Sequence, residues 1–199
     1  MHRYPRYVFG TFVIVLALTG CSSEDEAQKR AEATFTTIRW DGAEGSEEWT
    51  ASAFAALDDH ASPLVEMVPE DIDTYCPAYP DQSEESRKVF WTNLIASLSF
   101  HESTWRPDAA GGDESWFGLL QILPATAEGY GCAAQSSEEL KDGAANVACA
   151  LRIMAVTVPR DGVVSRDFKG VAADWGPFHQ RRKRRDIQRY TKSLPICRT

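Results

Sequence analysis

The stretch from Ser83 to Ser103 constrains the fold of this 199-residue chain most strongly. Its large apolar side chains Trp91, Ile95 and Leu98 recur at steps of four and three residues, which places them on one face of an α-helix. A helix with one apolar face must bury that face against other elements, so the segment requires a packed domain around it. We find no stretch in which apolar and polar residues alternate as they do in a half-buried strand. We therefore expect a mainly α-helical fold.

Shorter helical segments are expected on both sides of this one. Pro124 is suited to the first turn of a short helix that ends near Gly129. We predict further helices over residues 46–57, 144–156, 165–175 and 179–192. Ser46 and Ser165 are the expected N-caps of the first and third of these. In the helix expected over 165–175, one apolar face consists of Phe168, Val171, Ala172 and Trp175. A chain of this length can bury a substantial core, and we expect a single domain.

The first 20 residues have the pattern of an export signal. Arg3 and Arg6 precede a run of mostly apolar residues at 8–18, which is shorter than the roughly 20 residues that a membrane-spanning helix needs. The run leads into Leu18-Thr19-Gly20-Cys21, which resembles the lipobox of bacterial lipoproteins. This resemblance predicts cleavage after residue 20 and a lipid on Cys21. An ordinary cleaved signal with a chance cysteine is the alternative.

Small, polar and acidic residues follow the predicted lipidation site. We interpret residues 21–45 as a flexible tether between a lipid anchor and a folded domain over 46–199. Ser22, directly after Cys21, resembles the sorting pattern of outer-membrane lipoproteins. The expected location is therefore the periplasmic face of an outer membrane, with the membrane contacted through the anchor.

Four cysteines remain besides Cys21. An even number of cysteines in an exported chain indicates two disulfides, and four cysteines allow three pairings. We favour Cys132 with Cys149, which would pin a short loop to the following helix, and Cys76 with Cys197, which would tie the start of the core to its end. Reduced thiols that bind a metal are disfavoured by their spacing.

Glu102 is the residue best placed for chemistry. Continuing the stripe of Trp91, Ile95 and Leu98 by four positions puts this carboxyl group on the apolar face, at the helix end. Burial and the negative end of the helix dipole would both favour its protonated form. A carboxylic acid that stays protonated near neutral pH can protonate a glycosidic oxygen. The competing interpretation is an ordinary surface acid in a last turn that emerges into solvent.

The residues that follow Glu102 carry a resemblance. In order they are Glu102-Ser103, Trp105, Pro107, Ala109, Gly118-Leu119-Leu120-Gln121-Ile122, Pro124 and Thr126-Ala127. This pattern resembles the lytic murein transglycosylase family, whose domains have a lysozyme-like fold similar to goose-type lysozyme. The resemblance spans about residues 85–180 and implies a lysozyme-like single domain. The segment around Cys132 and Cys149 resembles a lipoprotein branch of that family with a paired cysteine bridge.

The resemblance also implies roles for individual residues. Glu102 matches the catalytic acid. The residues expected to bind the glycan are Ser103, Gly118, Leu119, Gln121, Asn146, Trp175 and Trp116, the last as a stacking face, with Trp105 as an alternative stacking face. Ala173-Asp174-Trp175 stands where the family has Ala-Tyr-Asn, so the family tyrosine has no counterpart and Asp174 or Trp175 would take its place. Glu114-Ser115 replaces a typical Gly-Ala, and the segment from Glu102 to Gln121 is one residue longer than usual.

The implied activity is cleavage of peptidoglycan glycan strands between N-acetylmuramic acid and N-acetylglucosamine, with 1,6-anhydro ends and no cofactor. A lysozyme-type hydrolase is the alternative, with Asp108, Asp113, Glu114 or Asp174 directing a water. A catalytically silent wall-binding lipoprotein, working with envelope machinery, is another. The pair His101-Glu102 could begin a zinc-hydrolase motif, but no second histidine follows at the required spacing, so no metal is expected.

Charge is distributed unevenly along the chain. The formal net charge of −8 argues against a general nucleic-acid binder. Residues 24–85 hold 17 acidic and three basic residues, whereas 181–199 hold eight basic residues and one acidic residue. The run from Arg181 to Arg185 is either a solvated helix face or a surface that attracts the phosphates of membrane lipids or the anionic polymers of the wall.

Overall fold

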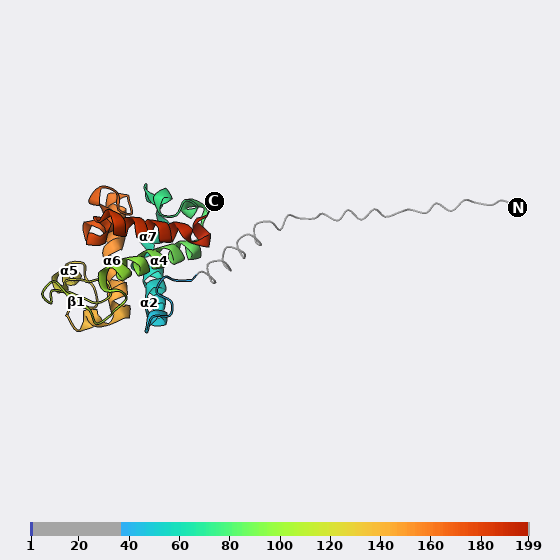
Figure 1. Cartoon of the computed structure of the whole chain (residues 1–199). Helices are drawn as coiled ribbons and strands as arrows, with labels where there is room; N and C mark the ends of the chain where they lie inside the picture. The colour runs from blue at the N-terminus through green and yellow to red at the C-terminus, as the bar shows by residue number, and fades with distance from the viewer. Residues whose placement is uncertain (2–36, 199) are drawn as a thin grey trace.

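The computed structural model of the chain describes Met1 and residues 37–198 (Figure 1). The expected signal peptide, Cys21 and most of the expected tether lie outside these residues. Within them the fold is mainly α-helical, as predicted. The longer helices are α2 (Ser46–Asp58), α4 (Glu84–Ser103), α6 (Gly143–Asp161) and α7 (Arg181–Ser193), with α3 (Ser62–Glu66) and α5 (Pro124–Gly129) as short ones.

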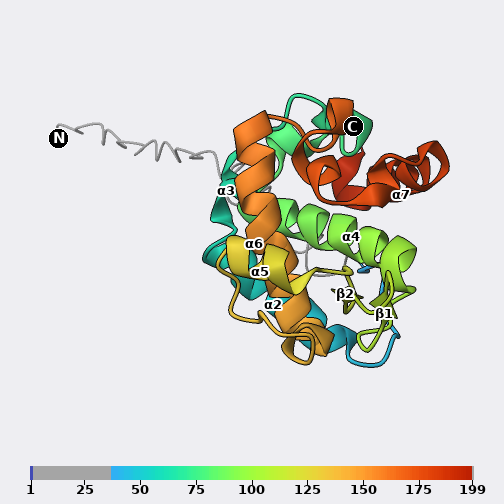
Figure 2. The same ribbon diagram turned by 90° about the vertical axis from the view of Figure 1, so that its left-hand side faces the viewer.

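The helix predicted first is the centre of the domain. Ser83 caps α4, since its hydroxyl accepts a hydrogen bond from the backbone N–H of Ser86. The negative charges of Glu84 and Glu85 in the first turn interact favourably with the positive end of the helix dipole. Every residue from 88 to 99 is buried. In Figure 2, α4 runs through the middle of the domain and α7 lies beside its C-terminal half. The helix is surrounded by α2, α3 and α7, so all its faces are covered.

The packed part of the chain begins before the expected boundary at residue 46. Ile38 and Trp40 are buried in the core, and the Trp40 indole donates a hydrogen bond to the hydroxyl of Thr50. Residues 38–45 are therefore part of the domain, because a tryptophan packed edge-on against Trp49 buries too much apolar area to belong to a tether. Gly45, and not Ser46, is the N-cap of α2.

The predicted helix over 165–175 is wrong. The segment forms two 3-10 turns, Arg166–Phe168 and Gly170–Ala173, because Asp167 and Phe168 both have positive φ. Ser165 makes no cap, and Phe168 is 62% exposed while Val171 and Trp175 are buried. The other predicted helices are present; α6 extends to Asp161, beyond the expected end at 156. Two-residue strands β1 (Ala110–Gly111) and β2 (Trp116–Phe117) form a small antiparallel hairpin that the pattern did not indicate.

Both favoured disulfides are present. Cys76 is bonded to Cys197, and Cys132 is bonded to Cys149. The first joins the turns before α4 to the end of the chain, and the second joins the loop after α5 to α6. None of the helices among the described residues is long and apolar enough to cross a membrane.

Candidate active site

Glu102 is the penultimate residue of α4, at the end of the buried helix. The helix stops directly behind it because Thr104 adopts a left-handed conformation with φ 55°, while its N–H still bonds the carbonyl oxygen of Phe100. Trp105 is left-handed too, with φ 59°. Left-handed backbone is unfavourable for a β-branched residue such as Thr104 and is concentrated at functional sites. The turn aims the chain away from the helix axis and leaves Glu102 at its tip.

The carboxyl group of Glu102 is poorly solvated. Its side chain is largely buried, and burial raises its pKa to about 7, although the nearby ammonium group of Lys183 acts in the opposite direction. Among the described residues, no group donates a hydrogen bond to this carboxylate, and no other acidic side chain is coupled to it. The group therefore changes protonation state near neutral pH, as a proton donor requires. The structure thus places Glu102 at the end of α4 with its side chain partly buried.

Helix α7 supplies the only charge that acts on Glu102 within the described part of the chain. Lys183 donates a hydrogen bond of 3.2 Å to the carbonyl oxygen of His101, which fixes its ammonium group at the end of α4. The His101 ring is 2.9 Å from Asp186, which also accepts a bond of 2.7 Å from Arg39. Burial lowers the pKa of His101 despite the carboxylate beside it. These contacts hold α7 against the last turn of α4.

A loop and the β1–β2 hairpin lie on the other side of α4. In Figures 1 and 2, α7 and the hairpin flank the C-terminal end of α4 from opposite sides. Trp116 of β2 is 46% exposed, and its ring lies over the backbone of Gly112, where a Cβ atom would be 1.5 Å from the indole. Asp113 and Glu114 form the hairpin tip with positive φ. Trp116 is thus an exposed aromatic face near the end of the helix.

The side chain of Asn146 in α6 holds the loop that follows the hairpin. Its side-chain oxygen accepts a bond of 2.8 Å from the N–H of Leu120, and its amide nitrogen donates to the carbonyl oxygens of Phe117 and Leu140. Position 118, next to the Asn146 side chain, requires a glycine. A Cβ there would lie 2.3 Å from the Asn146 amide nitrogen and 2.1 Å from the Leu140 oxygen, and its φ is +80°.

Comparison with known proteins identifies the domain. Residues 80–169 match the family model described as Transglycosylase SLT domain, which contains Glu102 and the loop that Asn146 holds. This region of the chain is therefore similar to the transglycosylase domain that the model describes. The match supports an enzyme that acts on peptidoglycan.

Solved structures resemble this chain in fold. The wild-type form 2 of Bd0314 DslA is 27% identical, with a TM-score of 0.73, and the match covers 81% of this chain and 98% of that one. A Glu-to-Gln mutant of Bd0314 DslA is 26% identical, with a TM-score of 0.73 and coverage of 81% and 97%. A second mutant, with a different glutamate replaced by glutamine, is 27% identical, with a TM-score of 0.71 and coverage of 79% and 95%. No curated protein matches the chain significantly.

Several residues that were expected to contact glycan make hydrogen bonds within the protein. Ser103 is buried; its hydroxyl donates to the Ser99 carbonyl and accepts from the N–H of Arg106. Gln121 donates to the carbonyl oxygens of Ala109 and Gly118. Gly118, Leu119 and Asn146 are buried as well. These interactions satisfy backbone groups of the loop between α4 and α5, which need partners where they are buried.

The two predicted tryptophans and Gln121 do meet at one place. Trp116, Gln121 and Trp175 line a small cavity of about 70 Å³ together with Asp174. Trp175 is 4% exposed and its indole donates a hydrogen bond to the Leu120 carbonyl, so it mainly supports the loop. Trp105, the other candidate stacking face, packs against Phe100 and donates to the Ala96 carbonyl. Trp116 is the aromatic side chain that remains available to a sugar.

Sequence reasoning missed Lys183 and the Asp186 network. Both residues lie more than 80 positions after Glu102 and sit within a run of basic residues, so no local pattern distinguishes Lys183 from its neighbours. Within residues 37–198, no group of three His, Cys, Asp or Glu side chains is arranged to hold a metal ion.

Proposed function

We propose that this enzyme cleaves the β-1,4 bond between N-acetylmuramic acid and N-acetylglucosamine and leaves 1,6-anhydromuramyl ends, with Glu102 as both acid and base. The observation that carries the proposal is a single, largely buried carboxyl group with a pKa of about 7 and no acidic partner among the described residues. Hydrolytic glycosidases generally need a second carboxylate at a defined distance to activate water or attack the sugar. A lone acid is sufficient when the substrate supplies its own nucleophile.

In the first step, protonated Glu102 gives its proton to the glycosidic oxygen as the bond to the muramyl carbon breaks. The departing sugar leaves as an alcohol, and the substrate's acetamido group supports the positive charge on the muramyl ring. Burial of Glu102 favours this step because it keeps the carboxyl protonated up to about pH 7.

In the second step, the ionised Glu102 accepts the proton of the muramyl 6-hydroxyl, whose oxygen then bonds to the anomeric carbon. The ring closes without water, and the enzyme returns to its protonated state. Lys183 favours the ionised form that this step needs, because its ammonium group acts on the carboxylate. Desolvation therefore favours the protonated form of Glu102 that the first step needs, and Lys183 favours the ionised form that the second step needs.

Mass spectrometry of digested peptidoglycan tests the proposal. Muropeptides lighter by one water molecule than their reducing-end counterparts are expected from the wild type. Glu102→Gln should abolish their release while the protein remains folded, and Glu128→Gln, on the exposed surface of α5, is the matched control. Reducing ends as the sole products would contradict the anhydro route.

Hydrolysis is the second candidate, and the hairpin carboxylates favour it. In the two Bd0314 DslA mutants, the replaced glutamates lie eleven positions apart. In this chain Asp113 lies eleven and Glu114 twelve positions after Glu102, both at the exposed tip of the hairpin. If either directs a water molecule, Asp113→Asn or Glu114→Gln should lower the yield of reducing ends. Under the anhydro route both variants keep activity, so the same product assay separates the candidates.

We also propose that the enzyme is a lipoprotein anchored through Cys21 at the periplasmic face of the outer membrane, where it can work with envelope machinery. The support is the lipobox-like sequence before Cys21 and Ser22 after it. Metabolic labelling with a radioactive fatty acid should mark the wild type and not Cys21→Ala. Equal labelling of both would refute the anchor.

A further inference from the structure

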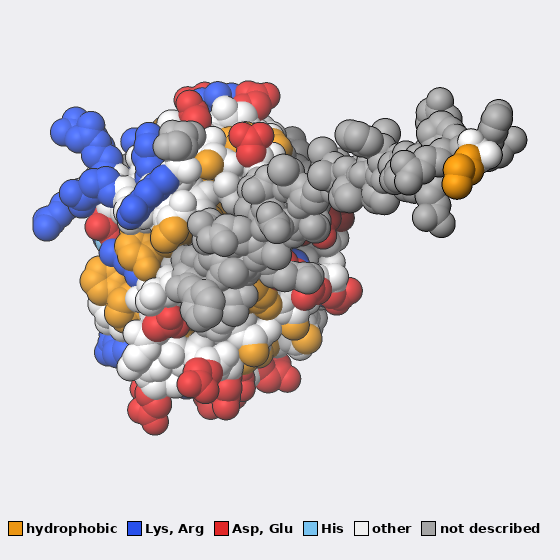
Figure 3. Space-filling view, turned by 90° about the vertical axis from the view of Figure 1, so that its right-hand side faces the viewer, with side chains coloured by type: hydrophobic (Ala, Val, Ile, Leu, Met, Phe, Trp, Pro, Cys, Tyr) orange, Lys and Arg blue, Asp and Glu red, His pale blue; other side chains and the backbone are white. Residues whose placement is uncertain are grey.

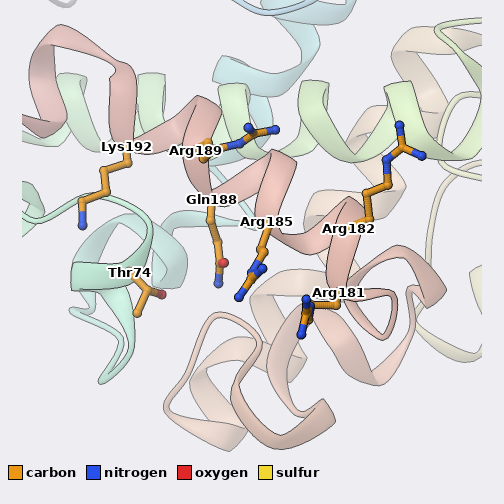
Figure 4. A pocket seen from close by; sticks show the side chains of 7 residues that line it. All are labelled: Thr74, Arg181, Arg182, Arg185, Gln188, Arg189 and Lys192. Atoms are coloured by element: carbon orange, nitrogen blue, oxygen red, sulfur yellow. The ribbon is translucent and has the colours of Figure 1, made fainter.

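Helix α7 and the 3-10 turn Ile72–Thr74 enclose a basic groove of about 660 Å³. Its lining consists of Thr74 and six residues of α7, namely Arg181, Arg182, Arg185, Gln188, Arg189 and Lys192. Figure 4 shows Arg181, Arg185 and Lys192 pointing to the side of α7 on which Thr74 lies, while Arg189 points to its other edge. We refer to these seven residues as the basic groove. It lies outside residues 80–169, which the family model covers.

The cations of the basic groove have few partners. The side chains of Arg181, Arg182 and Arg185 make no hydrogen bond or ion pair with any residue that the structure describes, and all three residues are exposed. Arg189 is 79% exposed at its side chain and pairs with Asp186 at 3.5 Å. Figure 3 shows Lys and Arg side chains gathered on one side of the molecule, with acidic side chains spread over the rest of that view. Like charges held this close repel one another, so an anion that binds here is favoured.

The arrangement of these cations fits a surface of phosphate groups. Arg181, Arg185 and Lys192 lie at i, i+4 and i+11, on one face of a helix, and span about 16 Å along it. Four of the five cations are arginines, whose planar guanidinium groups pair with phosphate oxygens two at a time. A row of this kind can engage several phosphate headgroups at once.

The position at which the chain joins the domain decides between possible anionic partners. Arg39, the third described residue after position 36, bonds to Asp186 at 2.7 Å and lies over the ring of Tyr190, 4.6 Å from its centroid. Asp186 also pairs with Arg189 of the basic groove. The N-terminal part of the chain therefore joins the domain against α7. Cys21 is 16 residues before residue 37, a span of at most about 55 Å when extended.

We infer that the basic groove docks the domain onto an anionic phospholipid surface. The choice of a bilayer rests on the proposed anchor at Cys21, because a lipid there would hold α7 near the membrane. It does not rest on the reaction proposed for Glu102. Two weak attachments, one lipid and one basic, reinforce each other.

Docking has a consequence for the active site. The basic groove and Lys183 lie on different faces of the same helix, and Lys183 is bonded to the end of α4. With the groove on the bilayer, Glu102 lies one helix away from the membrane surface. The enzyme would then cut glycan strands within a fixed, short distance of the membrane.

Vesicle binding by the full chain tests the inference. Vesicles of phosphatidylcholine with phosphatidylglycerol should bind the wild type, binding should weaken in 500 mM salt by roughly tenfold or more, and pure phosphatidylcholine vesicles should bind less. Arg181→Gln with Arg185→Gln should weaken binding to anionic vesicles by roughly 20- to 30-fold. Lys141→Gln with Arg160→Gln removes the same charge from η3 (Glu139–Lys141) and α6 and should bind as the wild type does.

Two further variants keep the result interpretable. Arg181→Lys with Arg185→Lys retains the charge and should still bind; its loss of binding would instead assign a site specific for arginine and overturn membrane docking. Glu102→Gln should bind vesicles normally even if the proposed reaction is wrong. Unchanged binding by the Gln pair in the groove, or binding to soluble polyphosphate and not to anionic vesicles, would overturn the inference. Melting temperatures of all variants establish that they are folded.

Discussion

Replacing Glu102 by glutamine should stabilise this enzyme at alkaline pH while abolishing its activity. Glutamine resembles the protonated acid in size and polarity, so the variant lacks only the negative charge. In the folded protein that charge is unfavourable, because burial raises the pKa of Glu102 from 4.5 to about 7. The substitution removes this unfavourable charge.

The size and pH range follow from linkage. A carboxyl whose pKa is raised on folding binds more protons in the native state than in the unfolded state between the two pKa values. The free energy of unfolding therefore falls as pH rises from about 4.5 to 7 and is constant above that range. The two pKa values differ by about 2.5, and at about 1.4 kcal/mol per unit the wild type should lose about 3 kcal/mol relative to Glu102→Gln.

Urea denaturation measured at intervals from pH 4 to pH 8.5 checks this expectation. The two proteins should be equally stable at pH 4 and should diverge to about 3 kcal/mol by pH 8. Glu128→Gln is the matched control, because a substitution of an exposed side chain should shift stability by less than about 0.5 kcal/mol at every pH. A stability difference for Glu102→Gln that does not vary with pH would refute the argument that its carboxyl is held in a desolvated position.

Three other perturbations test neighbouring features. Lys183→Met should raise the pKa of Glu102, because the ammonium group now lowers it, and should move the basic limb of the pH–rate profile to higher pH. Gly118→Ala should destabilise the fold by about 3 kcal/mol or more in urea denaturation, because its φ is +80° and the new Cβ would overlap Asn146 and Leu140. Replacing Cys76 and Cys197 by alanine should cost about 4–5 kcal/mol, against about 3 kcal/mol for Cys132 and Cys149, since the two bonds close loops with separations of 121 and 17 residues.

Each of these has an internal control. Lys183→Arg keeps the positive charge and should leave the pH profile near that of the wild type; an equal shift in both variants would mean that packing, and not charge, acts on Glu102. Gly129→Ala, in α5 with open space around the new Cβ, should be neutral or slightly stabilising. If it destabilises as much as Gly118→Ala, the clash at Asn146 is not the cause. Equal losses for the two cysteine pairs would argue against the loop-length account.

Features within one helix were predictable because their cause is local. The step of four and three residues through Trp91, Ile95 and Leu98 requires a helix, and the same step places Glu102 on the buried side at its end. The helix predicted after Ser165 rested on the same kind of local spacing, and that prediction was wrong. Its apolar spacing is helical, but the positive φ of Asp167 and Phe168 leads the chain away from a helix and leaves Phe168 in solvent.

The roles of the motif residues were less predictable. The resemblance implied that Ser103, Gln121 and Asn146 contact substrate; it did not indicate that their side chains also satisfy backbone groups of the protein. A sequence pattern shows which residues a site uses and does not show toward which side each one points. That direction depends on the backbone of a loop whose carbonyl and N–H groups need partners from α6, 26 residues away from Leu120.

The sequence by itself therefore predicted the central helix, the acid at its end and the resemblance to transglycosylases, and it favoured the two cysteine pairings that the structure shows. All but the pairings depend on residues close together along the chain, and the even number of cysteines left only three choices. The tertiary structure alone decided that Ile38 is part of the packed domain, that Asn146 holds the loop and that the charge of Lys183 of α7 acts on Glu102. These contacts join segments between about 25 and 80 residues apart in the sequence. Lys183 acts on Glu102 because the packing of the folded protein places α7 against the end of α4, which no local pattern shows.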